Sequence, residues 1–265
     1  MEYADGIAMY DVVSLGEAGL PGEVVAISGG VATVQSYEYT GGLAPGDTAR
    51  AHGRPLSAQL GPQLLGGVFD GLLRPLSGAG EWLLPGAVRA GEAGRTWSFV
   101  PYADTAARVS QGETLGEVRG VGPVRVRVLV PPGAGGVVER ISPEGDFPQD
   151  AVVAVVGGIE VRIGDSWPVR RPRPVRERGG EPTPLTTGQR MIDLLFPVAR
   201  GSTVAVPGGF GTGKTVLLQQ IAKWCDADVI VYIGCGERGN EMADVIAELA
   251  ALEDPAPADG WQTAR

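Results

Sequence analysis

One eight-residue segment constrains this chain more than any other. Residues 208–215 fit the phosphate-binding pattern G-x-x-x-x-G-K-[ST] without a mismatch. Glycines let such a loop curl closely around phosphate oxygens, while amide hydrogens at the start of the next helix point toward the anion. The segment therefore predicts a nucleoside triphosphate site. The predicted nucleotide-binding residues are Gly208, Gly209, Phe210, Gly211, Thr212, Gly213, Lys214 and Thr215.

The sequence around the loop supports this prediction. Because the chain has 42 glycines in 265 residues, chance glycine spacings are common and context matters. Residues 202–206 predict a buried strand before the loop, and residues 216–224 predict a helix after it, with one apolar stripe. Strand, loop and helix thus occur in the required order. The alternative is a glycine-rich turn that binds no ligand.

Two loop residues have expected chemical roles. Lys214 would place a positive charge near the β and γ phosphates, and it is one of only two lysines in the chain. Thr215 would offer its hydroxyl to Mg²⁺, which usually keeps several waters and bridges phosphate oxygens. The expected cofactors are therefore ATP or ADP together with Mg²⁺.

A second constellation follows the helix. Residues 228–234 form a nearly continuous apolar run, as expected for a parallel strand covered on both faces. Ligands sit beyond the carboxyl ends of such strands, so Glu237 and Arg238 should emerge beside the phosphate loop. There a carboxylate can orient an attacking water, and an arginine can stabilise charge on the transferred phosphoryl group. The alternative is a carboxylate at a helix N-terminus and a solvated arginine.

Motifs along almost the whole chain share one resemblance. They are residues 61–71 with 74–76, residues 167–170, residues 187–193, residues 208–215 with 222–228, and residues 234–242. Together they resemble the catalytic A (alpha) subunit of the vacuolar/archaeal-type rotary ATPases. The resemblance is specific, because the related B subunit lacks a complete phosphate loop and the bacterial-type β subunit lacks the long insertion between the two sets of motifs.

The resemblance implies an activity, roles and partners. It implies a subunit that couples ATP hydrolysis or synthesis to proton translocation, with Lys214 and Thr215 on phosphate and Mg²⁺. Glu237 would polarise the hydrolytic water and Arg238 would lie near the γ phosphate; Phe210 also matches the family. The implied partners are B subunits in an alternating hexameric ring, with central and peripheral stalk subunits. The chain would be cytoplasmic and would meet the membrane only through the complex.

The expected fold is multi-domain: an N-terminal β-barrel, a β-rich inserted domain and the first part of an α/β P-loop (RecA-like) domain. In the barrel, residues 23–28 and 31–37 flank Gly29-Gly30, which suits a primed hairpin turn. In the inserted domain, which the resemblance identifies as the bulge on the peripheral stalk, residues 124–130 and 152–156 predict strands. The expected boundaries are 1–56 for the barrel, 57–76 for a connector, 77–176 for the inserted domain and 177–265 for the nucleotide domain.

Composition excludes several other classes of protein. The basic run at residues 170–178 could be a nucleic-acid arm, but proline-punctuated charge favours a solvated linker. A net charge of −9 also disfavours nucleic-acid binding. No stretch is apolar enough to span a membrane. Cys225 and Cys235 are expected to be free core thiols, and the single histidine, His52, excludes a His-rich metal site.

A second hypothesis concerns the extent of the chain. The family's catalytic subunits are roughly twice this length and continue past Glu237 through a strand ending in an Mg²⁺-ordering Asp. The alternative function is therefore a truncated, non-hydrolysing relic or assembly fragment that at most binds nucleotide. Because two parallel strands are marginal alone, residues 185–265 are predicted to be less stable than the β domains.

Overall fold

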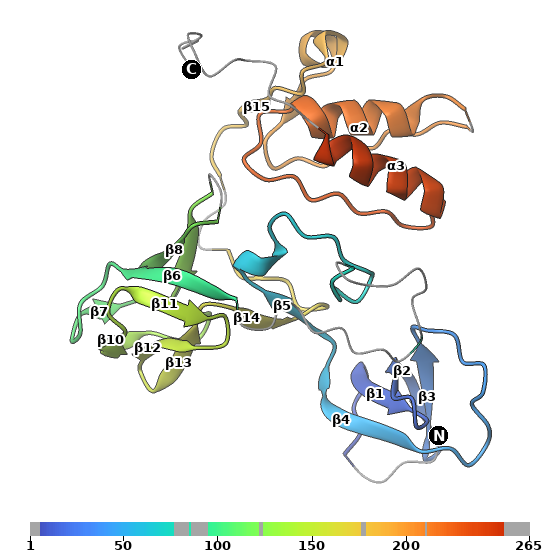
Figure 1. Ribbon diagram of the computed structural model, residues 1–265, viewed down its shortest axis with the longest axis vertical. Helices are drawn as coiled ribbons and strands as arrows, with labels where there is room; N and C mark the ends of the chain where they lie inside the picture. Colours follow the sequence, from blue (N-terminus) through green and yellow to red (C-terminus); the bar gives the residue numbers. More distant parts are fainter. Residues whose placement is uncertain are drawn as a thin grey trace. The chain divides into compact units, whose positions relative to one another are not determined.

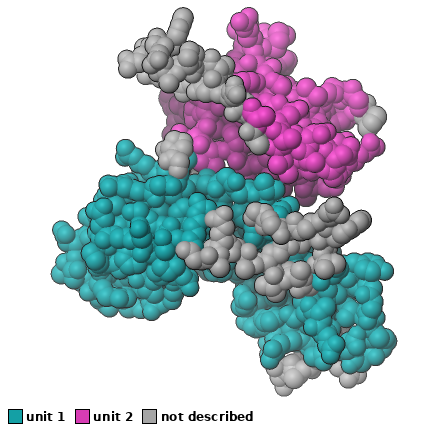
Figure 2. Space-filling view, viewed as in Figure 1, with its two compact units in different colours: residues 1–176 teal, residues 177–265 magenta. Residues whose placement is uncertain are grey.

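A computed structural model describes residues 6–76, 85, 95–121, 124–175, 179–209 and 211–251. The chain divides into two compact units, residues 1–176 and residues 177–265, which Figure 2 distinguishes by colour. The first unit is built from strands, and the longer helices belong to the second (Figure 1). Among the described residues, no helix combines the length and apolar content needed to cross a membrane.

The first unit begins with a four-stranded antiparallel sheet, called the N-terminal sheet below. Its β2–β3 hairpin turns at Gly29 and Gly30, whose φ angles of 56° and 79° confirm the predicted primed turn. Val13 and Val24 are fully buried against it. The strands, in spatial order, are β3 (Val31–Ser36), β2 (Leu20–Ser28), β1 (Asp11–Leu15) and β4 (Ala49–Pro55).

Two further four-stranded sheets enclose one hydrophobic core and form a β-sandwich. Phe99 and Leu115 from one sheet and Val138 and Val153 from the other are fully buried in it. The first sheet runs β11 (Gly145–Pro148), β6 (Thr96–Pro101), β8 (Thr114–Arg119), β9 (Val126–Leu129); the second runs β13 (Ile159–Arg162), β12 (Val152–Val156), β10 (Gly136–Ile141), β7 (Arg108–Val109).

The sandwich confirms the predicted β-rich domain. The strand expected over residues 124–130 is β9, which is shorter, and the strand expected over residues 152–156 is β12. Along β9 the side chains alternate between solvent and core, because Arg127 is exposed while Val128 is buried. One face of this edge strand therefore packs on the core and the other faces water.

The two strands that flank the sandwich in the sequence pair with each other and form a two-stranded stem. β5 (Ser57–Leu60) and β14 (Asp165–Pro168) pair antiparallel, from Leu60 opposite Asp165 to Ser57 opposite Pro168 (Figure 1). A short 3-10 helix, η1 (Pro62–Leu64), follows β5. The chain thus leaves and rejoins the stem at adjacent positions.

The basic run after the stem is bound to its own unit. Arg170 pairs with Glu23, and Arg173 pairs with Asp165 at 3.1 Å. The guanidinium groups of Arg171 and Arg173 also lie over the Trp167 ring, at 5.2 and 4.6 Å from its centroid. Residues 170–173 are exposed, as expected of a solvated linker, but their guanidinium groups also pair with carboxylates and stack on an aromatic ring, as planar guanidinium groups can.

The regular structure of the second unit is mainly helical. The helix predicted over residues 216–224 is confirmed, and it begins two residues earlier, at Lys214. A short antiparallel pair of strands precedes the phosphate loop. The elements are β15 (Pro184–Leu185), α1 (Arg190–Leu195), β16 (Val198–Ala199), α2 (Lys214–Trp224) and α3 (Gly239–Ala250).

Two predicted strands of this unit are wrong. Residues 202–206 and 228–234 form no strand in the described structure, and Val231 and Ile233 are 77% and 75% exposed instead of buried. A strand exists only where a neighbour satisfies its backbone, and neither run has one among the described residues. Cys235 is likewise exposed, so it is a free thiol but not a core thiol.

Candidate functional site

The phosphate loop ends in a turn that requires glycine. Gly211 and Gly213 have φ angles of 75° and 81°, in the left-handed region that side-chain-bearing residues avoid. Gly213 is the N-cap of α2, which begins at Lys214. The helix therefore starts directly behind the glycines, and its first amide hydrogens are left without partners inside the helix.

Lys214 folds back over the loop. Its ammonium group donates to the carbonyl oxygen of Gly209 at 2.6 Å and also to that of Gly208. Since a lysine ammonium has three donors, these two bonds orient it and leave the third for an anion. The Thr212 hydroxyl donates to the same Gly209 carbonyl at 2.9 Å, which closes the loop from the other side.

The remaining loop residues are consistent with a cradle. A Cβ at Gly208 would lie 2.7 Å from the Thr212 hydroxyl oxygen, so only glycine fits without a shift. Thr215 is the second residue of α2 and is half-buried, next to Lys214 in sequence. Phe210 lies outside the described residues.

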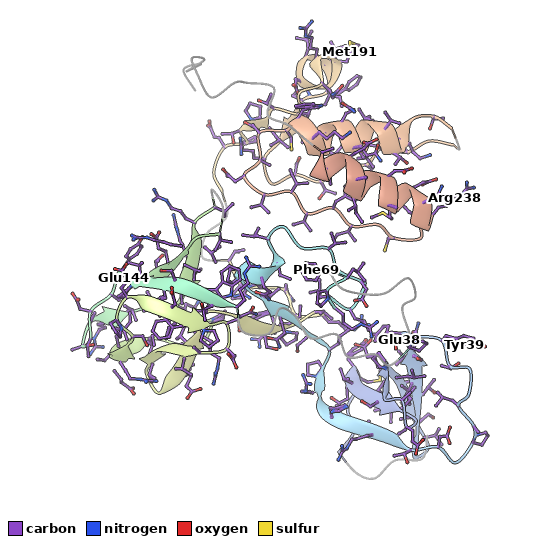
Figure 3. All side chains as sticks on the ribbon, in the orientation of Figure 1. Glu38, Tyr39, Phe69, Glu144, Met191 and Arg238 are labelled. Atoms are coloured by element: carbon purple, nitrogen blue, oxygen red, sulfur yellow. The ribbon has the colours of Figure 1, made fainter. Side chains whose placement is uncertain are left out.

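Glu237 and Arg238 precede α3. Gly236 turns the chain with a φ of 70°, and Arg238 is the N-cap of α3 with its carbonyl accepting from the Met242 amide at 3.2 Å. Both side chains are exposed, and Figure 3 labels Arg238 at the start of the helix. Burial, and then the charges of Glu237 and Glu241, raise the pKa of Tyr232 above its usual range.

The two helices are parallel. Lys223, in the last turn of α2, forms an ion pair of 2.5 Å with Glu248, near the end of α3. Each of these residues lies about 14 Å along its helix from the first helical residue, at 1.5 Å rise per residue. The two N-termini are therefore level, at the end of the unit opposite this ion pair, as Figure 1 shows. The partial positive charges of both helix ends converge there.

The structure thus brings the predicted residues to one end of the second unit in two groups. Gly208, Gly209, Thr212 and Lys214 are joined by hydrogen bonds. Within the part of the chain that the structure describes, no hydrogen bond joins Glu237 to this group. The arrangement suits an elongated anion that spans the two helix ends.

Sequence reasoning missed a set of contacts at the C-terminal end of α2, opposite the phosphate loop. Buried Thr187 donates its hydroxyl and its amide to Asp193, at 2.7 and 2.9 Å, and these bonds hold the pKa of Asp193 below its usual range. A Cβ at Gly188 would lie 2.7 Å from Cβ of Trp224, so the segment packs tightly against the last residue of α2. The motif at residues 187–193 is visible in the sequence, but its spacing matches no helix or strand period that would reveal these contacts.

A metal at this site would depend on few protein ligands. In the described ranges, no group of three or more His, Cys, Asp or Glu side chains could hold a metal ion. The Thr215 hydroxyl fits Mg²⁺, because this ion prefers oxygen ligands and usually binds with phosphate oxygens and waters instead of a protein cage.

Comparison with known families follows the same division of the chain. The beta-barrel domain of the ATP synthase alpha/beta family matches residues 2–53, and the ATPsynthase alpha/beta subunit barrel-sandwich domain matches residues 88–170. The nucleotide-binding domain of the ATP synthase alpha/beta family matches residues 188–256, which include the whole phosphate loop.

Curated relatives resemble the chain over almost its full extent. The V-type ATP synthase alpha chain of Anaeromyxobacter dehalogenans (strain 2CP-C) is 48% identical over 255 residues, which are 94% of this chain and 44% of that relative. The A subunit of the A-type ATP synthase of Sulfolobus acidocaldarius is 43% identical over 265 residues, covering 95% and 45%. Its counterpart from Methanopyrus kandleri is 44% identical over 261 residues, covering 95% and 44%.

The chain therefore spans less than half the length of these relatives. Within that length it matches the barrel, the barrel-sandwich and the nucleotide-binding domains in one order. The agreement of three successive domain models with relatives of one kind leads to a single conclusion. The chain belongs to the ATP synthase alpha/beta family, with the alpha and A chains of V-type and A-type ATP synthases among its relatives.

Proposed function

We propose that this chain binds Mg²⁺-ATP at residues 208–215 as the nucleotide-binding part of a catalytic A (alpha) subunit of a rotary ATPase. The observation that carries the proposal is the position of Lys214, whose ammonium group is held by two loop carbonyls at the N-terminus of α2. A phosphate chain placed there would meet a fixed cation, free amide hydrogens and the partial charge of the helix. These are the donors that a nucleoside triphosphate requires.

The chain's own residues divide the work of binding and chemistry. The ATP supplies the phosphoryl group, and Mg²⁺ neutralises charge on its oxygens when both are bound. Lys214 and the glycine amides would hold the β and γ phosphates, and Thr215 would offer its hydroxyl to the metal. Glu237 would accept a hydrogen bond from a water molecule and orient it, and Arg238 would stabilise charge on the γ phosphate.

The remaining proposals concern the assembly. The A and B subunits would alternate in a hexameric ring carrying central and peripheral stalk subunits, with ATP turnover coupled to proton movement. The chain would be part of a cytoplasmic head that contacts the membrane only through the complex. The domain boundaries 1–56, 57–76, 77–176 and 177–265 stay a proposal, supported by the division of the chain after residue 176.

Calorimetric titration of the 265-residue chain with Mg²⁺-ATP tests the binding proposal. Lys214→Ala removes the cation that faces the phosphates, and the variant should lose the binding heat. Lys223→Ala is the matched control, because it removes the chain's other lysine from the opposite end of the same helix. Equal binding by the parent and Lys214→Ala, or no binding by the parent, would contradict the proposal.

The catalytic part needs a separate assay. In a ring assembled with B-type subunits, Glu237→Gln should keep nucleotide binding and lose phosphate release, since the amide is a poor acceptor for a polarised water. Turnover close to that of the unaltered ring would remove Glu237 from the proposed mechanism.

A further inference from the structure

A buried carboxylate in the N-terminal sheet has its partner far away in the sequence. Glu23 of β2 is only 1% exposed, and Arg170, which lies 147 positions later, reaches it from the segment after the stem. The guanidinium group binds it bidentately, with Nε to Oε1 at 3.0 Å and a terminal nitrogen to Oε2 at 2.5 Å. Such paired hydrogen bonds fix orientation as well as distance.

Neighbouring groups complete this contact. The Tyr37 hydroxyl donates to Oε2 of Glu23 at 3.0 Å, and the Arg170 guanidinium lies 4.6 Å from the centroid of the Tyr10 ring. The Val169 amide adds a backbone hydrogen bond of 2.9 Å to the Leu56 carbonyl. The side chains of Arg170, Glu23, Tyr37 and Tyr10 therefore attach the chain leaving the stem to the sheet, and the backbone bond extends the stem by one residue toward β4.

A second arginine attaches the chain on the other side of the stem. Arg74 donates to Glu38 and to Asp70, each at 2.6 Å. Asp70 also accepts the Leu72 and Arg74 amides, both at 2.9 Å, so the loop that carries Arg74 is closed on itself. Glu38 directly follows Tyr37 after β3, and Figure 3 labels it in this region. Both arginines thus reach the same end of the β3 strand.

The stem alone is a weak connection. It has two strands of four residues each, and isolated two-stranded sheets are marginal in water. Without other contacts it would let the β-sandwich swing on the N-terminal sheet.

We propose that Arg170 with Glu23, and Arg74 with Glu38, form a clamp that makes the N-terminal sheet, the stem and the β-sandwich one rigid body. The clamp is independent of the nucleotide site, because all its residues belong to the first unit. Its role is mechanical: displacement of the sandwich is carried to the N-terminal sheet without a hinge at the stem.

Distance measurements between spin labels test the clamp on the full chain. Labels at Val31→Cys on β3 and Arg108→Cys on β7, both exposed positions, report on the two bodies after Cys225→Ser and Cys235→Ser remove the native thiols. The parent should give a narrow distance distribution by pulsed electron resonance. The double variant Glu23→Gln/Glu38→Gln should broaden it, because neutral amides cannot hold the arginines.

Two further variants keep the result interpretable. Glu160→Gln removes an ion pair with Arg162 on the surface of the sandwich, away from the clamp, and should leave the distribution narrow. Arg170→Lys keeps the charge beside Glu23 but loses the bidentate contact, so it should broaden the distribution even if the double variant fails to fold. An unchanged width in Arg170→Lys, or a broad distribution in the parent, would overturn the proposal.

Discussion

Replacing Gly213 with alanine tests whether the left-handed turn of the phosphate loop is needed for nucleotide binding. Gly213 has φ and ψ of 81° and 14°, and a Cβ built on it would meet no atom within 4 Å. The substitution therefore adds backbone strain without a steric clash. Gly180 is the matched control, because its Cβ would also meet nothing within 4 Å, its φ lies outside the left-handed region, and it belongs to the second unit but not to the phosphate loop.

The magnitude follows from the backbone alone. A residue with a Cβ in the left-handed region costs about 1–2 kcal/mol relative to glycine. An alanine at position 213 should relax toward a right-handed conformation and turn the first amides of α2 away from the phosphates. Binding must then restore the strained turn, which weakens the affinity by about 5- to 30-fold, since 1.4 kcal/mol is a factor of ten.

Calorimetric titration with Mg²⁺-ATP measures this difference directly, and circular dichroism checks that both variants keep their fold. Gly213→Ala should bind more weakly than the parent, while Gly180→Ala should bind like it. The reasoning is refuted if the two alanine variants bind equally well, because the left-handed turn would then have no part in recognition.

Three further predictions concern stability. Residues 185–265 should exchange their amide hydrogens faster than strands β6, β8 and β12, because among that segment's described residues Val245 is the single buried hydrophobic side chain. Equal protection of the two regions in hydrogen-exchange mass spectrometry would contradict this prediction. Leu115→Ala should lower the free energy of unfolding of the first unit by about 2–5 kcal/mol in urea titrations, because it leaves a cavity at a fully buried position of the sandwich core. A loss well below that range would show that the core collapses into the cavity. The hydrogen bond from Arg170 holds the pKa of Glu23 below its usual range in the folded protein. The ionised carboxylate therefore stabilises the fold at any pH above its unfolded pKa of about 4.3, and this stabilisation is lost as the pH falls through the lower pKa of the folded state. Glu23→Gln should therefore lose less stability than the parent in that acid range, and parallel melting-temperature curves for the two proteins would argue against the linkage.

Local patterns predicted local structure well. The hairpin at Gly29 and Gly30, the helix after the phosphate loop and the strands β9 and β12 depend on residues close in sequence, where turn chemistry and periodicity act directly. The phosphate loop could be predicted for the same reason, since its residues form one continuous segment. Its role in binding stays a prediction.

Contacts between distant residues could not be predicted in this way. Nothing in the sequence around Glu23 indicates that its partner is Arg170, because pairing across 147 positions is decided by the fold. Residues 228–234 are the opposite case, in which the sequence predicts a strand that the structure does not contain. Their apolar run resembles a buried strand, yet a strand forms only where another strand lies beside it, and composition carries no information about that neighbour.

The adjacent ends of the stem make the β-sandwich a removable module. Because Leu60 and Asp165 are opposite each other, a tight turn between them would join β5 to β14 directly as a plain hairpin. Lineages could therefore lengthen, exchange or delete everything between these positions while the rest of the chain keeps its path. The stem is the place where sequence comparisons across the family should show the largest differences in length with the least disturbance on either side.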